Sequence, residues 1–201
     1  MNKNIIICGV GGQGTILASK LISTAAMGRG IEVKSAETIG MAQRGGSVFS
    51  YIRLGDHVYS PMIAQGTADV IVAFEPGEGV RMLPYLSPQG TMVVSSHPVQ
   101  PVTAALSGGN YQGQEMLAYL KQKVHRLQIV DVDQAVDELG TAKVINLLLL
   151  GVAVNFADMG IEEQDIRQAI AKKIAPKFHE MNLVALDYAK EYVKISKEQQ
   201  V

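Results

Sequence analysis

Six residues near the N-terminus, 9–14, read Gly-Val-Gly-Gly-Gln-Gly and constrain the fold more than any other part of this sequence. They follow an apolar, β-branched run at residues 4–8, which is typical of a buried parallel strand. They lead into residues 13–27, where apolar side chains recur at helical spacing. A second short strand is expected at residues 31–36. The order of strand, tight turn, helix and strand predicts a β–α–β unit within an open α/β sheet.

The glycine turn fits the G-x-G-x-x-G pattern and stands between a strand and a helix, as a nucleotide-binding turn requires. Glycine lets the backbone approach a ligand closely, and the helix N-terminus presents unpaired N–H groups to an anion. An acidic residue near the end of the second strand could hold a ribose. The same glycines could instead only permit close packing of the strand against the helix, or dock a partner chain. The candidate cofactor-binding residues are Gly9, Gly11, Gly12, Gln13, Gly14 and Glu37.

A second glycine-flanked loop, residues 38–47, joins the second strand to an expected antiparallel pair. Its one charged side chain is Arg44, whose guanidinium can hold a carboxylate or a phosphate through two hydrogen bonds. Alternatively, Arg44 only pins the loop to a neighbouring carboxylate. We expect the loops 9–14 and 38–47 to meet at the C-terminal ends of adjacent strands, where open α/β sheets bind ligands. The candidate substrate- or partner-binding residues are Met41, Gln43, Arg44, Gly45, Gly46 and Ser47.

The rest of the chain predicts a three-layer α/β/α, Rossmann-like domain with a mostly parallel sheet and a helical C-terminal third. One antiparallel excursion is expected near residues 47–60, with strands at 47–54 and 58–60. A turn is expected at residues 86–90. The remaining strands are expected at residues 68–74, 91–95 and 127–132, and the remaining helices at 77–85, 114–124, 141–157, 161–174 and 178–195.

Composition excludes several classes of function. Eighteen Lys and Arg against 19 Asp and Glu give a formal charge of −1, so we expect no nucleic-acid partner. A single cysteine cannot supply a disulfide framework, an iron–sulfur cluster or a thiolate zinc site, and the four histidines show no metal-ligand spacing. The most apolar stretch, residues 144–157, is shorter than the ~20 residues of a membrane span. We therefore expect a cytoplasmic protein without a metal site, with residues 1–195 as one domain and 196–201 as a frayed tail.

Four further residues and one apolar segment bear on the candidate site or the core. Cys8 ends the first strand, where a small buried hydrophobe is favoured over a redox group. Glu75 ends another strand and could line the same crevice as the two loops. Asp131 and Asp133 could meet a ligand, although capping of the following helix is favoured. Residues 144–157 are expected in the core rather than at an interface.

Five segments form a pattern that extends over nearly the whole chain. They read Gly-Val-Gly-Gly-Gln-Gly at 9–14, Glu-Thr-Ile-Gly-Met-Ala-Gln-Arg-Gly-Gly-Ser-Val at 37–48, Val-Tyr-Ser-Pro-Met-Ile at 58–63, Ala-Asp-Val-Ile-Val-Ala-Phe-Glu-Pro at 68–76 and Asn-Leu-Leu-Leu-Leu-Gly at 146–151. Together they resemble the gamma-type subunit family of 2-oxoacid:ferredoxin oxidoreductases. The Met-Ala-Gln-Arg-Gly-Gly loop favours the indolepyruvate type of that family over the pyruvate type.

The resemblance implies a small oxidoreductase subunit that is inactive without a large partner subunit. The family converts a 2-oxoacid, CoA and oxidised ferredoxin into an acyl-CoA, CO2 and reduced ferredoxin, and the indolepyruvate type acts on arylpyruvates. Thiamine diphosphate, Mg and [4Fe–4S] clusters are expected in the large subunit, and ferredoxin would meet the complex. Residues 55–57 read Gly-Asp-His, which is not the Gly-Asp-Gly start of a thiamine–magnesium motif. The isolated chain could form a homodimer.

In this interpretation the two loops face the active site of the large subunit and hold CoA phosphates or the substrate carboxylate. Two other functions stay open on the sequence. One is a free-standing NAD(P)-binding Rossmann enzyme, although the second half of the chain offers no obvious catalytic His, Lys or Tyr. The other is a non-catalytic, nucleotide-binding assembly module.

Overall fold

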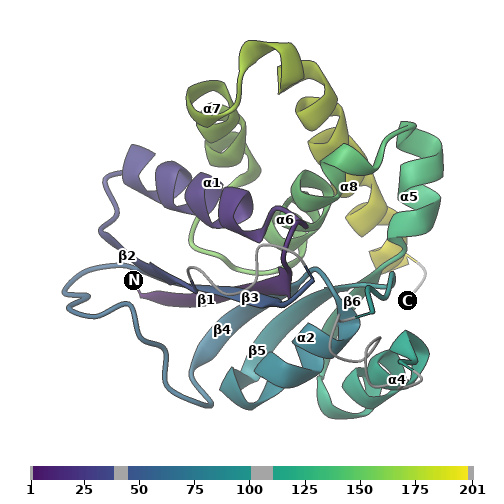
Figure 1. The fold of residues 1–201 in the computed structure, drawn as a ribbon. Coiled ribbons are helices and arrows are strands. Elements are labelled where there is room, and N and C mark those ends of the chain that lie inside the picture. Colours follow the sequence, from purple (N-terminus) through teal and green to yellow (C-terminus); the bar gives the residue numbers. More distant parts are fainter. Residues whose placement is uncertain (1, 39–44, 101–110, 199–201) are drawn as a thin grey trace.

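A mixed, six-stranded sheet forms the centre of the protein, and the computed structural model describes residues 2–38, 45–100 and 111–198 (Figure 1). The order of the strands is β2-β3-β1-β4-β5-β6. Neighbours β1, β4, β5 and β6 are parallel, whereas β3 is antiparallel to both β1 and β2. The strands are β1 (Lys3–Val10), β2 (Val33–Glu37), β3 (Ser47–Leu54), β4 (Ala68–Ala73), β5 (Leu86–Ser95) and β6 (Arg126–Val130).

Helices cover both faces of this sheet, which confirms the three-layer α/β/α prediction (Figure 1). One face carries α1 (Thr15–Gly28), α5 (Val132–Leu139), α6 (Ile145–Phe156), α7 (Glu163–Lys173) and α8 (His179–Glu198). The other face carries α2 (Pro76–Met82), the short 3-10 turn Leu83–Tyr85 and α4 (Gly113–Lys123). Helix α8 continues three residues beyond the end expected from the sequence.

The antiparallel excursion is present as β3, but the expected return strand at residues 58–60 is wrong. Strand β3 already has hydrogen-bonded neighbours on both sides, β1 and β2, so it offers no free edge to a hairpin partner. The following segment is held by a side chain instead, because the Arg53 guanidinium donates to the carbonyl oxygens of Ser60 at 3.0 Å and Met62 at 3.4 Å.

The expected turn at residues 86–90 is also wrong, because β5 already begins at Leu86. Leu86 pairs with Ala68 of β4, and a register shift separates that pair from the regular ladder that starts at Val70 and Thr91. The irregularity is tight, since a Cβ atom on Gly90 would lie 2.9 Å from the Ala68 carbonyl oxygen. A glycine inside a strand is a common sign of such a bulge.

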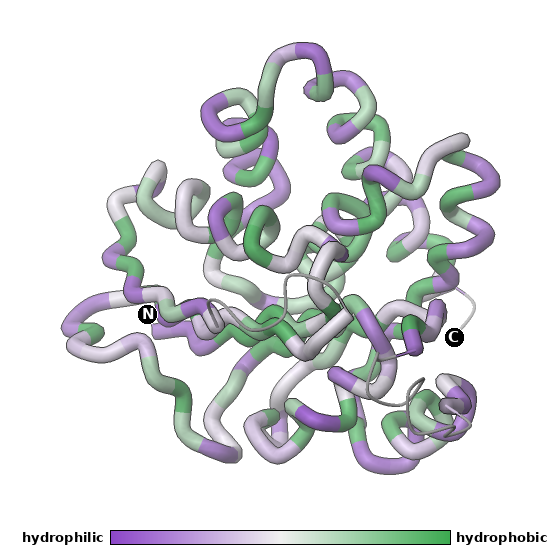
Figure 2. The backbone as a smooth tube through the Cα atoms, viewed as in Figure 1, coloured by the Kyte–Doolittle hydropathy of each residue, from purple (hydrophilic) through white to green (hydrophobic). Residues whose placement is uncertain are grey.

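Helix α6 lies in the core, as its composition predicts. Its side chains are buried almost all round, and in Figure 2 the hydrophobic colour follows the central strands and the inner helices. Gly151 brings α6 close to α8, because a Cβ atom there would lie 2.7 Å from the Ala189 Cβ. Each fully buried leucine contributes roughly 1.5–3 kcal/mol through removal of its side chain from water. Over the described ranges, no helix is both long and apolar enough to cross a membrane.

The chain changes side of the sheet between β1 and β4. Helix α1, which follows β1, packs on one face, and α2, which follows the neighbouring parallel strand β4, packs on the other. In open α/β sheets a crevice forms at such a switch point, beyond the carboxyl ends of the strands, and ligands bind there. The glycine turn 9–14 lies at this switch point.

Candidate functional site

The two glycine loops meet in the structure. The Gly11 N–H donates to the Gly46 carbonyl oxygen at 2.9 Å, and the Gly45 N–H lies 3.5 Å from the Gly11 carbonyl oxygen. This pairing continues the β1–β3 ladder, whose last pair is Val10 with Ser47. The expected meeting is therefore present for residues 45–47, but it uses the start of an antiparallel strand rather than the end of a parallel one. Met41, Gln43 and Arg44 lie outside the described residues.

Gln13 and Gly9 serve the internal structure of the turn. The Gln13 side chain accepts the Val10 N–H at 2.6 Å and donates to the Phe74 carbonyl oxygen at 2.9 Å, so it ties β1 to the end of β4. Gly9 leaves room for this arrangement, because a Cβ atom there would lie 2.7 Å from Gln13 Oε1 and 2.9 Å from Phe74 Cβ. These contacts agree with the packing interpretation for the two residues.

The other end of the turn is open. Gly12 has a φ of +106°, and a Cβ atom on it would meet nothing within 4 Å. Gly14, with a φ of +85°, stands at the N-cap of α1 and so brings no side-chain oxygen to the first N–H groups of the helix. The first turn of α1 also lacks acidic residues. This helix end therefore presents positive partial charge and hydrogen-bond donors to an anion.

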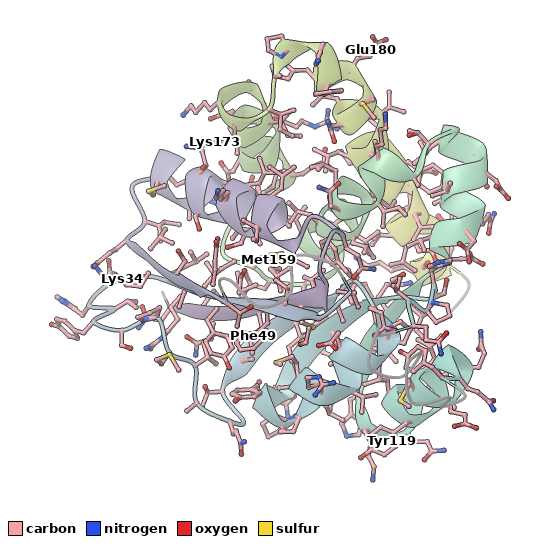
Figure 3. All side chains as sticks on the ribbon, viewed as in Figure 1. Lys34, Phe49, Tyr119, Met159, Lys173 and Glu180 are labelled. Atoms are coloured by element: carbon pink, nitrogen blue, oxygen red, sulfur yellow. The ribbon has the colours of Figure 1, made fainter. Side chains whose placement is uncertain are left out.

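Glu37 does not lie beside the glycine turn. Strand β3 separates β2 from β1, with Glu37 opposite Ser50 and Ser50 opposite Ile7. Two strand spacings put Glu37 roughly 10 Å from β1. Its carboxylate borders a different hollow, a groove of about 680 Å³ between α1, β2 and α7 that also includes Lys20 and Lys173. In Figure 3 the labelled Lys173 lies between α7 and α1.

Ser47 connects the second loop to α2 through Glu78, a residue that the sequence patterns did not single out. The Ser47 hydroxyl donates to Glu78 Oε2 at 2.5 Å, and Arg81 Nε donates to the same carboxylate at 3.3 Å. Glu78 is only 2% exposed, whereas the Arg81 side chain is 60% exposed. The Glu78 carboxylate therefore fixes the start of β3 against α2. The pattern Glu-Pro-Gly-Glu at residues 75–78 was its sequence signal, since it resembles a capped helix start.

Glu75 is fully buried at the floor of the crevice. As N-cap of α2 it accepts the Glu78 N–H at 2.9 Å and the hydroxyl of Tyr111, which in turn accepts the Gly77 N–H at 3.0 Å. Burial raises the pKa of the Glu75 carboxyl above its ordinary value, and the nearby Glu78 carboxylate adds to this, against the hydrogen bonds that lower it. The N-terminal end of α2 is thus filled by the chain's own side chains.

Cys8 and Asp131 each have a structural role. Cys8 is fully buried, its sulfur lies 3.5 Å from the Glu78 carbonyl oxygen, and burial raises the pKa of the thiol well above its ordinary value, as for an inert buried group. Asp131 caps α5, since its side chain accepts the Gln134 N–H at 3.1 Å. Asp133 follows in the first turn of that helix and lies 2.8 Å from His97. Across the described parts of the chain, no three His, Cys, Asp or Glu side chains are grouped to hold a metal ion.

Comparison with known proteins gives matches along nearly the whole chain. Residues 4–192 match the family model of pyruvate ferredoxin/flavodoxin oxidoreductases. An indolepyruvate oxidoreductase subunit IorB of Pyrococcus horikoshii is 32% identical over 197 residues, which cover 97% of this chain and 96% of that protein. A subunit of the same name from Archaeoglobus fulgidus is 33% identical and covers 92% of each chain. A pyruvate/ketoisovalerate oxidoreductase common subunit gamma of Pyrococcus furiosus is 24% identical.

Solved structures share the fold. The gamma subunit of a keto/oxoacid ferredoxin oxidoreductase from Geobacter sulfurreducens matches with a TM-score of 0.68 and 20% identity, over 96% of this chain and 99% of that one. A 2-oxoglutarate:ferredoxin oxidoreductase of Magnetococcus marinus, solved with 2-oxoglutarate, coenzyme A and succinyl-CoA bound, matches with a TM-score of 0.70 and 20% identity. This match covers 96% of the present chain but 31% of the longer one.

Proposed function

The chain belongs to the pyruvate ferredoxin/flavodoxin oxidoreductase family, and we propose that it acts within an arylpyruvate-oxidising member as the small, CoA-facing subunit. The reaction would be the oxidative decarboxylation of an arylpyruvate with CoA to an aryl-acetyl-CoA and CO2, with reduction of ferredoxin. The full-length similarity to four subunits named for indolepyruvate oxidoreductase supports this choice of substrate.

One observation carries the role of this chain. The turn 9–14 and the loop that ends at Ser47 are hydrogen-bonded to each other at the switch point of the sheet, beside the uncapped N-terminus of α1. Such an end binds phosphate groups, and CoA carries several. Arg44 would add a cation for a phosphate or for the substrate carboxylate. We therefore assign Gly11, Gly12 and Gly14 to anion binding, and Gln13 and Ser47 to the support of the two loops.

The redox equipment would lie in a large partner subunit. The residues of this chain do not fit an iron–sulfur cluster, because its one thiol, Cys8, is buried and its pKa is raised. Thiamine diphosphate, with Mg, would supply carbanion chemistry at the 2-oxoacid carbonyl from its site in the large subunit. The present chain would contribute binding, orientation and closure of the active site, and it would be inactive alone.

Co-purification with the large subunit tests this proposal. The complex should reduce ferredoxin, or a viologen dye, with indolepyruvate and CoA, while each subunit alone should not. Arg44→Ala in the complex should raise the KM for CoA or for the 2-oxoacid at least tenfold. An intact complex with unchanged KM values would exclude the ligand-binding role, and turnover of NAD(P) by the isolated chain would favour the free-standing dehydrogenase instead. Strand β3, which keeps Glu37 away from the turn, argues against such a dehydrogenase.

A further inference from the structure

Strand β2 leaves one edge of the sheet open. It is the first strand in the order of the sheet, so among the described strands only β3 pairs with it (Figure 1). Hydrogen bonds from Gly55 N–H to the Glu32 carbonyl and from Thr38 N–H to the Phe49 carbonyl, each 3.0 Å long, flank the β2–β3 ladder. Because bonded pairs alternate in an antiparallel ladder, every second residue of β2 points its N–H and C=O away from β3. The residues with these outward groups are Val33, Ser35 and Glu37.

The opposite edge of the sheet is closed by the chain itself. The Val130 carbonyl of β6 accepts the Ser96 N–H at 2.8 Å, so the backbone groups on either side of Val130 face outward. The Tyr192 hydroxyl of α8 accepts the Asp131 N–H at 3.1 Å and donates to the Ile129 carbonyl at 3.2 Å. Within residues 2–38, 45–100 and 111–198, no side chain does the same for β2. An open edge of this kind is a template for pairing with another chain.

The groove between α1, β2 and α7 borders this open edge. Ser35 and Glu37 line it from β2, so the residues with outward backbone groups also direct their side chains to the α1 side of the sheet. A strand added to β2 would direct every second side chain to that same side, into the groove. Hydrogen bonds to the edge would then give affinity, and the groove would select the side chains of the added strand.

The charges of the groove favour an acidic occupant. Lys20 and Lys173 line it together with one carboxylate, Glu37, and none of the three forms an ion pair with another described residue. On the other side of the sheet Lys34 is already paired, because its Nζ lies 3.3 Å from the Glu32 carboxylate. A second copy of this chain would bring its own two lysines to the groove, and like charges across an interface disfavour such a pair.

We infer that the β2 edge docks an extended, acidic segment of the large partner subunit, which adds a strand to the sheet and directs its side chains into the groove. Strand β2 leads directly into the second loop, residues 38–47, so a partner that covers this loop also reaches the edge. The identity of this partner rests on the proposed function, which turns the second loop towards the large subunit.

Hydrogen exchange tests the docking residue by residue. In the free chain the outward amides of Val33, Ser35 and Glu37 should exchange faster than those of Lys34 and Ala36, which donate to β3. In the complex with the large subunit, the exchange of the three outward amides should slow at least tenfold. Outward amides that exchange equally fast in the free chain and in the complex would overturn the proposal.

Two variants test the edge and the groove separately, with binding to the large subunit measured by surface plasmon resonance. Ser35→Pro removes one outward N–H and no bond to β3, a place where an edge strand tolerates proline. It should weaken binding at least tenfold. Lys173→Glu, which leaves the strand unchanged, should weaken binding at least fivefold. Its matched control is Lys172→Glu in the same last turn of α7, outside the groove, which should bind within twofold of the unaltered chain.

Further outcomes overturn the docking or separate it from the proposed function. Binding by Lys173→Glu equal to that of Lys172→Glu would overturn it, and so would a free dimer that Ser35→Pro dissociates, since the occupant would then be a second copy. A complex with protected outward amides but no turnover of arylpyruvates would leave the docking in place while the proposed function fails. An active complex with unprotected amides would do the reverse, and the absence of any complex would overturn both.

Discussion

The N-terminal ends of α1 and α2 differ although they occupy equivalent places in the fold. Each helix follows one of two neighbouring parallel strands, β1 and β4, at the same edge of the sheet. At α2, the buried Glu75 and the hydroxyl of Tyr111 accept the first N–H groups. At α1, Gly14 offers no side-chain acceptor. The same strand–turn–helix geometry therefore gives one end that the chain satisfies itself and one that is suited to a ligand.

The largest expected effect comes from removing the side-chain acceptor at the N-terminal end of α2. Glu75→Ala removes the acceptor of the Glu78 N–H and of the Tyr111 hydroxyl, and it leaves both groups buried and unpaired. We expect the free energy of unfolding to fall by about 3 kcal/mol, measured by urea denaturation. Glu75→Gln is the control, because it keeps an acceptor oxygen and should lose much less. Equal losses in the two variants would show that the hydrogen bonds do not hold this end.

A smaller effect on the free energy of unfolding is expected from placing a side chain at the N-terminal end of α1. Gly14→Ala forces a side chain into a left-handed backbone and against Asn146, and should lower the free energy of unfolding by about 2 kcal/mol. Gly12→Ala also has a positive φ but meets open space, so it should cost less. Chemical denaturation of both variants isolates the contact with Asn146. The contact is unimportant if the two losses agree.

Ser47→Ala removes the hydrogen bond from the Ser47 hydroxyl to Glu78, which joins the second loop to α2. We expect a loss of about 1 kcal/mol in the free energy of unfolding. Ser50→Ala on the same strand is a matched control, because the Ser50 hydroxyl is buried with no hydrogen-bond partner among the described residues. That second change should be neutral or stabilising. A larger loss at Ser50 than at Ser47 would contradict the link between Ser47 and Glu78.

The smallest effect is a pH dependence. The folded protein raises the pKa of Glu75, so the native state binds a proton more tightly than the unfolded chain. The stability due to this group is complete below the unfolded pKa of about 4.3 and is lost as the pH rises through the folded pKa. Urea denaturation between pH 4 and 8 should show a decline in the unaltered chain that Glu75→Gln lacks. Parallel curves for the two proteins would disprove a raised pKa.

Local sequence patterns predicted the elements of the fold better than their arrangement. The alternation of apolar and polar residues at 47–54 predicted β3 with its observed bounds, because that pattern follows from one strand having one buried face. Nothing local states which strands β3 will pair with. The predicted return strand at residues 58–60 was wrong for this reason, because β3 is hydrogen-bonded to β1 on one side and to β2 on the other.

The candidate site shows the same limit. The glycine turn was located correctly, because its pattern is contiguous in sequence. Glu37 was expected beside it on the assumption that β1 and β2 are neighbours, and the insertion of β3 separates them. Glu78 was missed as a residue of the candidate site, since its partner, Ser47, is distant in sequence and only the folded chain brings the two together.

The insertion of β3 also determines when the site can form during synthesis. The β1–β3 ladder runs from Lys3 with Leu54 to Val10 with Ser47, so the glycine turn acquires its Gly46 partner only after the second loop and all of β3 have emerged. Pairings of this sequence separation are slow, because the loop must close before the contacts stabilise it. Asn146, which lies against Gly14, is made later still. A ribosome-bound chain therefore has its glycine motif early, but the pairing of the two loops forms only after β3 has emerged.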